Sequence, residues 1–212
     1  MTETAGKAGG RGGIRAASRE WGKAMAKSKA AGQVYQLKIT LRDIKPPVWR
    51  RVEVQDCTLA KLHDIIQTCM GWDDYHLHEF DIGGERYGDP RQWQDDLRGE
   101  MEFGNEGKVK LSQIVAQGVK KFGYVYDMGD HWDHTIQVEK VLDPEPGVGY
   151  PRCIAGKRAC PPEDCGGPWG YSDFVDAIQN PNHERHEELL EWVGAEFDPE
   201  AFAIEAVNEE LR

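Results

Sequence analysis

The first clear pattern along the chain is an alternation of apolar and polar residues. Residues 34–41 alternate with a period of two and are rich in β-branched and aromatic side chains, which is typical of a strand. A Lys-Pro-Pro sequence interrupts this pattern, and residues 48–54 resume it. We therefore expect two strands that pair across a proline-bearing loop.

A helical period follows this hairpin. Apolar residues between Leu59 and Met70 recur at spacings that place them on one face of a helix. Thr58 is a typical N-cap and Gly71 a typical stop, so the sequence marks both ends of this helix. Further elements expected in the middle of the chain are a hairpin of residues 75–82 and 85–87, a surface loop over residues 88–108, a short helix over residues 111–119, and strands over residues 121–127 and 132–142.

The pattern changes after Leu142, where a loop rich in Pro and Gly is followed by residues 150–171, which show no clear period. Helical spacing then returns. The helices expected there span residues 171–179, residues 183–193, and a last segment from Asp198-Pro199-Glu200 to Leu211. Strands first and helices later predict an α+β fold, with a mainly antiparallel sheet of about six strands covered by helices and a helical C-terminal third.

Charge divides the chain into two parts. Residues 1–32 hold seven Lys and Arg and two Glu, a net charge of +5. Because the whole chain has a net charge of −11, residues 33–212 carry −16. We expect a disordered basic tail over residues 1–32 and a single acidic domain over residues 33–212. An acidic domain repels phosphate backbones, so we do not expect the domain to bind nucleic acid, although the tail could contact nucleic acid weakly.

The composition also bears on location. No run approaches the roughly 18 apolar residues that would cross a membrane, and the first residues lack the apolar core of a secretory signal. We expect a soluble cytoplasmic protein with no membrane partner. The five cysteines, an odd number, are then expected to be thiols or metal ligands rather than disulfides.

Three of these cysteines suggest a zinc site. Cys153, Cys160 and Cys165 have six and four residues between them, whereas zinc usually takes ligands from closer pairs, and a fourth ligand would be needed. Within this hypothesis, a structural site made by the cysteines and one histidine fits better than a catalytic site, because nothing selects an open coordination position. The alternative is that the cysteines are small buried apolar residues.

Histidines could complete or replace that site. His76 and His78 lie two apart in an expected strand, so their side chains would face the same side and could hold one metal ion. His131 and His134 lie three apart, so at most one of them, such as His134, could join. The alternative is that these histidines pair with other groups in the sheet.

The segment after Cys160 is a candidate binding loop. Pro161 and Pro162 fix two successive φ angles, Glu163 and Asp164 offer carboxylates, and Gly166-Gly167 permits a sharp turn. A rigid acidic loop of this kind could hold a cation or receive a basic partner segment. Alternatively, it is a structural loop whose carboxylates cap a helix or pair with a nearby arginine.

Carboxylates between Asp127 and Asp133 also suggest a metal-dependent hydrolase. The suggestion is weak, because aspartates in turns often bond to their own backbone. The sequence contains no phosphate-binding glycine loop, nucleophile elbow, dinucleotide fingerprint, His-Glu-x-x-His or Cys-x-x-Cys motif. The common nucleotide, hydrolase and redox machineries are therefore unsupported.

Several motifs match one known family in order. They are Ile44 to Arg51, Gly71-Trp72 with His76 to Phe80, Tyr126 to His134, Arg158 to Gly167 with Gly170-Tyr171, and Asp198-Pro199-Glu200. On these motifs, residues 33–212 resemble the plasmid pRiA4b ORF-3-like family, whose members are sometimes labelled insertion-element passenger proteins. The resemblance implies an association with mobile elements or plasmids and brings no assigned biochemical activity.

Two functions from different classes follow. The first is a binding or interaction module that uses the Pro161–Gly167 loop as its recognition edge and takes a protein or peptide partner, preferably a basic one. The alternative is a metal-dependent enzyme, such as a hydrolase of phosphate esters that uses His76, His78 and His134, or a structural zinc protein. An enzyme should gather these side chains in a concave pocket, whereas a module should leave them apart or buried.

Overall fold

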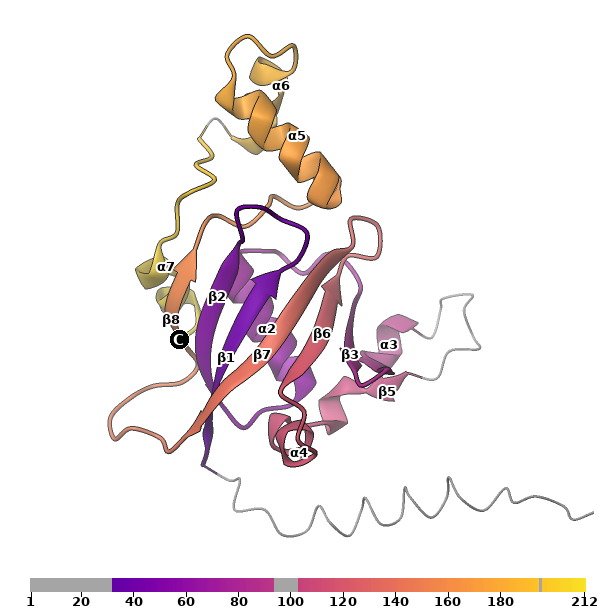
Figure 1. Ribbon diagram of the computed structural model, residues 1–212, viewed down its shortest axis with the longest axis vertical. Helices are drawn as coiled ribbons and strands as arrows, with labels where there is room; N and C mark the ends of the chain where they lie inside the picture. The colour runs from indigo at the N-terminus through magenta and orange to yellow at the C-terminus, as the bar shows by residue number, and fades with distance from the viewer. Residues whose placement is uncertain (1–31, 94–102, 195) are drawn as a thin grey trace, which may run out of the picture. The chain divides into compact units, whose positions relative to one another are not determined.

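An eight-stranded sheet forms the centre of the computed structural model, which describes residues 32–93, 103–194 and 196–212. The strand order is β5-β4-β3-β6-β7-β1-β2-β8, and most of the strands can be followed in Figure 1. The strands are β1 (Val34–Leu41), β2 (Trp49–Gln55), β3 (His78–Ile82), β4 (Glu85–Gly88), β5 (Gly104–Asn105), β6 (Lys121–Tyr126), β7 (Trp132–Leu142) and β8 (Arg152–Lys157). The basic tail predicted over residues 1–32 lies outside the described residues, except for Gly32.

Six α-helices and one 3-10 helix accompany the sheet in the described part of the chain. They are α2 (Leu59–Met70), α3 (Pro90–Trp93), η2 (Glu106–Lys108), α4 (Leu111–Ala116), α5 (Gly167–Gln179), α6 (His186–Val193) and α7 (Ile204–Glu210). The α+β class is confirmed. The loop predicted over residues 88–108 contains α3, β5 and η2, and its residues 94–102 lie outside the described residues.

The sheet has more strands than the six expected, and it is mixed. All neighbouring pairs are antiparallel except β4 and β5, whose short contact is parallel. The expected pairing of β1 with β2 is confirmed. The prediction missed β8, an edge strand that pairs with β2 through a register shift between Arg51 and Val52. An edge strand with an irregular register loses its period of two, which hides it in the sequence.

Helix α2 covers one face of the sheet (Figure 1) and has the bounds that the sequence predicts. The Thr58 hydroxyl accepts a hydrogen bond from Lys61 N at 3.2 Å, and Gly71 ends the helix in the left-handed region at φ 82°. Leu59, Leu62 and Ile66 are fully buried beneath the helix. Burying each such side chain contributes about 1.5–3 kcal/mol, so packing fixes α2 on the sheet.

A buried arginine joins α2 to the end of the chain. The Arg50 side chain on β2 is 2% exposed, and its guanidinium donates to the carbonyl oxygens of Cys69, Trp49 and Lys157 at 2.8, 3.0 and 3.1 Å. The guanidinium also lies 4.2 Å from the centre of the Phe202 ring. Desolvation lowers the pKa of Arg50 from its usual value, and the carbonyl groups and the ring offset part of the cost of burial.

The last helix starts later than predicted. Asp198-Pro199-Glu200 forms a turn in which the Asp198 carboxylate accepts from Glu200 N at 2.9 Å, but α7 begins only at Ile204. The chain between them carries Phe202 onto β8, where a Cβ on Gly156 would lie 2.4 Å from the Phe202 ring. Packing of this ring against β8 therefore prevails over the local helix-start signal.

Candidate functional site

The structure does not gather the predicted zinc ligands into one site. In the described part of the chain, three ligand atoms from His, Cys, Asp or Glu come within 4.8 Å of one another in two groups, and neither contains a cysteine. Cys153 is buried on β8, where its thiol donates to the Ala155 carbonyl at 3.5 Å and the neighbouring Cys69 thiol of α2 lowers its pKa. Burial raises the pKa values of the Cys160 and Cys165 thiols, that of Cys165 to about 12, so both are protonated at neutral pH.

The three predicted histidine ligands lie in different surroundings. His76 precedes β3 and approaches Asp127 and Asp164, whereas His78 is the first residue of β3 and belongs to the other group of ligand atoms. His134 is completely buried on β7, with ring centres 5.3 Å from Tyr124 and 5.5 Å from Trp72. One metal ion held by His76, His78 and His134 together has no support in this arrangement.

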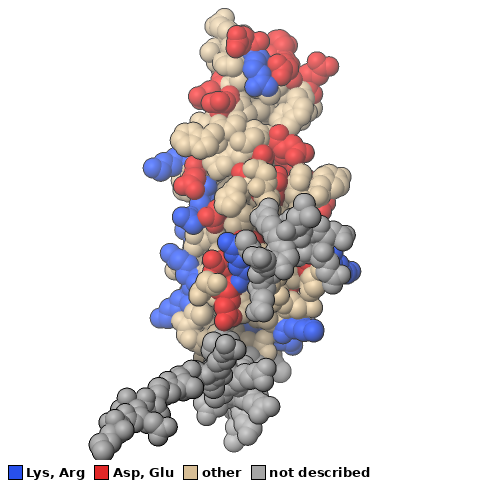
Figure 2. Space-filling model, turned by 90° about the vertical axis from the view of Figure 1, so that its right-hand side faces the viewer, with Lys and Arg blue, Asp and Glu red and all other residues tan. Residues whose placement is uncertain are grey.

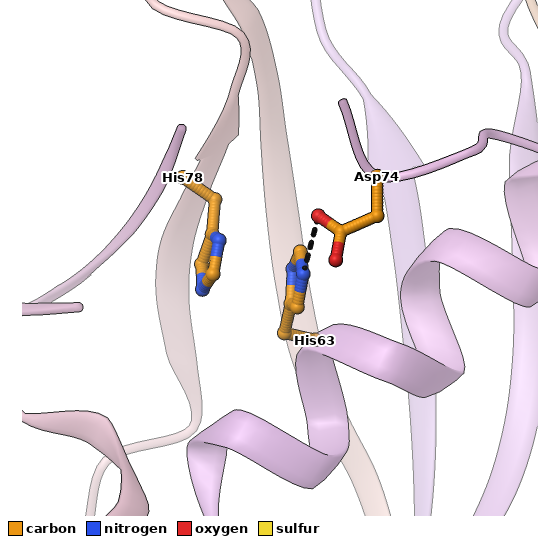
Figure 3. Close-up of side chains that lie close together, drawn as sticks. All are labelled: His63, Asp74 and His78. Carbon is orange, nitrogen blue, oxygen red and sulfur yellow. Dashed lines mark hydrogen bonds and ion pairs between the residues drawn. The ribbon is translucent and has the colours of Figure 1, made fainter. Parts of the chain in front are cut away.

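A pair of stacked histidines lies beneath α2. The rings of His63 from α2 and His78 from β3 are parallel to within 7°, with centres 3.5 Å apart, and both residues are buried. Figure 3 shows the two rings face to face, with Asp74 approaching His63 from the loop after α2. The side chain of Asp74 is 46% exposed, so the pair connects to solvent through this carboxylate.

Three polar groups hold the pair in place. His63 Nε2 lies 2.9 Å from Asp74 Oδ1, and His63 Nδ1 lies 2.8 Å from the Tyr124 hydroxyl. His78 Nε2 lies 2.8 Å from Glu106 Oε2, while the buried His78 Nδ1 has no hydrogen-bond partner among the described residues. Desolvation, with the nearby His78 ring, lowers the pKa of His63 to about 4, so His63 is neutral at pH 7.

We expect His134 to make the fold sensitive to mild acid. Burial lowers its pKa from 6.5 to about 4, and neither ring nitrogen makes a hydrogen bond of good geometry to another described residue, although the Trp132 and Tyr124 backbones lie close enough to favour the proton slightly. Because the unfolded chain binds the proton first, stability present above pH 6.5 falls as the pH drops toward 4, by on the order of 2 kcal/mol. Urea unfolding across this range measures the loss.

His134→Leu separates His134 from the other titrating groups. The variant removes the proton-binding ring without breaking a good hydrogen bond, so its stability at pH 7 should change little. The difference between wild type and variant should then move in favour of the variant as the pH falls below 6.5. Parallel pH profiles for the two proteins would contradict the assignment of this loss to His134.

The predicted binding loop is tied to the core on one side. The Trp72 indole donates to the Pro161 carbonyl at 2.9 Å, and Glu163 accepts from Asp73 N at 3.0 Å and from the Tyr126 hydroxyl. These bonds join the Pro161–Gly167 loop to the segment after α2. Glu163 therefore anchors the loop, and Arg158, the nearby arginine of the structural interpretation, donates to Glu200 instead.

The other side of the loop is tied to the turn between β6 and β7. Gly166 N donates to Asp130 Oδ2 at 3.0 Å, and Gly167 lies against the Asp130 carbonyl with φ 70°. Within the turn, Asp127 Oδ1 accepts from Gly129 N at 2.8 Å. Asp127 thus bonds to its own turn, as aspartates in turns often do.

The second group of ligand atoms lies at this junction. His76 Nε2 is 3.1 Å from Asp164 Oδ1 and 3.8 Å from Asp127 Oδ2, and within the described part of the chain no hydrogen bond of good geometry satisfies this nitrogen. The Asp127 side chain is buried, whereas that of Asp164 is 69% exposed. The predicted loop and a predicted histidine therefore meet, and Asp164 is the loop carboxylate that faces solvent.

A groove of about 840 Å³ lies beside the loop; we call it the loop groove. The β1–β2 connection, the β6–β7 turn, helix α5 and the Pro199-Glu200 turn contribute to its lining. Its charged lining residues are Asp43, Asp130, Asp176 and Glu200, with Lys45 and Arg158, and His131 also lines it. The fixed charges are thus four carboxylates and two cations. The Trp169 side chain, 87% exposed, also lies on its lining.

Acidic side chains also gather on the helices next to the groove. Figure 2 shows mainly carboxylates over the end of the molecule where α5 and α6 lie, while most Lys and Arg visible in this view lie farther down. Asp173 and Asp176 belong to α5, and Glu187, Glu188 and Glu191 belong to α6. The potential near the loop groove is therefore negative.

Comparison with known protein families identifies the family of this chain. The family model described as plasmid pRiA4b ORF-3-like protein matches residues 33–206. The chain belongs to the plasmid pRiA4b ORF-3-like family. The match contains every residue of both ligand groups and all the charged residues that line the loop groove.

Two proteins similar to this chain carry no assigned function. The chain is 39% identical over 177 residues to the uncharacterized protein y4hQ of Sinorhizobium fredii (strain NBRC 101917 / NGR234), covering 82% of this chain and 89% of that protein. It is also similar to the crystal structure of MM3350, a protein of unknown function from Methanosarcina mazei Go1, with a TM-score of 0.73 and 38% identity, covering 82% of this chain and 97% of the other. The fold is therefore shared with a solved structure.

Sequence reasoning missed three residues that surround His78 in the structure. His63, Asp74 and Glu106 come from separate segments, and only tertiary pairing brings them to His78. One signal was present, since His63 lies four residues after Leu59, on the apolar face of helix α2.

No helix in the described ranges has the length and apolar character needed to cross a membrane.

Proposed function

We propose that this family member is an interaction module that binds a basic peptide segment in the loop groove. The observation that carries the proposal is the charge of the groove lining. Four carboxylates and two cations line a groove of about 840 Å³. This volume is within the usual range of ligand-binding clefts, about 300–1,000 Å³. Arg and Lys side chains of a partner would complement its charge.

The fixed walls of the groove support the proposal. Arg158 donates to Glu200 at 2.7 Å and to the Pro47 carbonyl at 3.2 Å, so two segments of the lining are held together. Asp130 is held by the loop through Gly166. A site that is formed before binding loses less conformational entropy when the ligand arrives.

Unpaired groups at the groove offer the contacts. The Asp43 and Asp176 side chains are exposed, and their carboxylates have no ion-pair or hydrogen-bond partner among the described residues, so both are available to a cation. Exposed Trp169 offers a ring face to an arginine or lysine side chain. Asp164 extends the acidic surface along the loop.

The alternative of a phosphate-ester hydrolase has less support. It requires His76, His78 and His134 around one reacting centre, and these residues lie in three surroundings. Phosphate esters would also approach a surface whose net charge is negative. The arrangement favours the interaction module, in which these histidines pack or pair.

Fluorescence anisotropy of a short labelled peptide of Arg, Lys and Gly tests the proposal. The basic peptide should bind, its affinity should fall as salt rises, and a peptide with Glu in place of Arg and Lys should not bind. Asp43→Asn and Asp176→Asn should each weaken binding about two- to fivefold, because exposed pairs contribute up to about 1 kcal/mol. Trp169→Ala should also weaken binding.

Glu209→Gln is the matched control. It removes one exposed carboxylate from α7, outside the groove lining, so it lowers the overall negative charge without touching the site. Its affinity for the basic peptide should equal that of the wild type. Absence of binding, equal binding of the acidic peptide, or an equal loss in Glu209→Gln would each refute the groove as a basic-peptide site.

A further inference from the structure

We infer that His63, Asp74 and His78 form a binding site for one zinc ion beneath α2. These residues offer two imidazole nitrogens and one carboxylate oxygen, all within 4.8 Å of one another. Zinc sites use this set of ligands, with nitrogen and oxygen bonds of about 2.0–2.2 Å. The site is separate from the loop groove and does not depend on the peptide proposal.

Three of the four ring nitrogens in the stacked pair have a hydrogen-bond partner, and the fourth, His78 Nδ1, has none among the described residues. His78 Nδ1 is buried and lacks a hydrogen bond among the described residues, while Nε2 of the same ring faces Glu106 at 2.8 Å. A neutral imidazole that donates one N–H to Glu106 leaves the lone pair on Nδ1 free. Metal-binding histidines usually show this pattern, with a carboxylate on the nitrogen away from the ion.

Both ring nitrogens of His63 have partners. Its Nε2 faces Asp74 Oδ1 at 2.9 Å, and its Nδ1 faces the Tyr124 hydroxyl at 2.8 Å. A zinc ion would take the place of the proton between His63 Nε2 and Asp74, and the ring proton would then lie on Nδ1. The Tyr124 hydroxyl can accept a hydrogen bond from this N–H, because a phenol oxygen both donates and accepts hydrogen bonds.

The stack itself has to open for zinc to bind. The rings lie 3.5 Å apart and parallel to within 7°, so the lone pairs in their planes do not converge on one point. Tilting of the rings about their contacts with Glu106 and Tyr124 would allow both nitrogens to reach the ion, and the exposed Asp74 lies on the solvent side to admit it. Three protein ligands would leave a fourth tetrahedral position for water or another group.

The experiment uses the full chain without an affinity tag, stripped with a chelator and then titrated with zinc alone. We expect one equivalent to bind, and Co²⁺ in its place should give the visible absorption of a low-symmetry site. His63→Gln and His78→Gln should each weaken zinc binding at least about 100-fold, and Asp74→Asn and Glu106→Gln about tenfold. Asp74→Asn keeps the buried rings in place, so its effect is readable even where a histidine variant fails to fold.

His76→Gln is the matched control, because it removes a histidine from the other ligand group. Zinc binding should survive this change. A chain that binds no stoichiometric zinc would overturn the inference. So would zinc that is lost in His76→Gln and retained in Asp74→Asn, since that result places the ion between His76, Asp127 and Asp164.

Discussion

Replacing Trp72 with alanine is expected to lower the free energy of unfolding by about 4 kcal/mol, as for other large buried aromatic residues. The Trp72 side chain is 6% exposed, and its ring centre lies 4.9 Å from that of Tyr126 and 6.0 Å from that of Trp132. Its indole also donates to Pro161. The variant thus creates a cavity and releases the loop from the core, and urea unfolding followed by circular dichroism measures the total cost.

Trp72→Phe separates these two effects. Phenylalanine keeps most of the ring packing and loses the hydrogen bond to Pro161, which should cost about 1–2 kcal/mol. Limited proteolysis should then cut the Pro161–Gly167 loop faster in both variants than in the wild type. A loss below about 1 kcal/mol for Trp72→Ala would show that the ring does not support the junction of loop and core.

Local signals predict the elements whose ends are set locally. Helix α2 has the bounds expected from Thr58 and Gly71, because a side-chain cap and a left-handed glycine act within the helix itself. The hairpin of β1 and β2 is confirmed for a similar reason, since its alternation sets the pairing register. By contrast, β8 and the start of α7 depend on partners distant in sequence, namely β2 and Gly156.

The candidate sites follow the same division. The sequence offers the Pro161–Gly167 loop, three cysteines, three histidines and the carboxylates from Asp127 to Asp133 as candidates, and of these the structure brings Asp164, His76 and Asp127 together. It could not predict that His78 stacks on His63, because the register of β3 against β6 and the packing of α2 decide this contact. The spacing of two residues in one strand predicts only that their side chains lie on the same face of the sheet. This prediction does not apply to His76, because β3 begins at His78.

Gly167→Ala is expected to cost about 3 kcal/mol of stability and to weaken peptide binding in the loop groove. Gly167 has φ 70°, and an added Cβ would lie 2.4 Å from the Asp130 carbonyl oxygen. The left-handed backbone alone costs an alanine about 1–2 kcal/mol, and the steric overlap adds the displacement of the β6–β7 turn or of the loop. Because Asp130 lines the groove, its displacement should change the site as well as the fold.

Gly149→Ala is the matched control, because an added Cβ there meets no atom within 4 Å and its φ is not in the left-handed range. Its stability should stay within about 0.5 kcal/mol of the wild type. Comparison of the two variants by urea unfolding, and by anisotropy with the basic peptide, links stability to binding through one contact. Gly167→Ala with wild-type stability would mean that the loop can withdraw from Asp130 at little cost, and the rigid wall on which the proposed peptide site depends would then be absent.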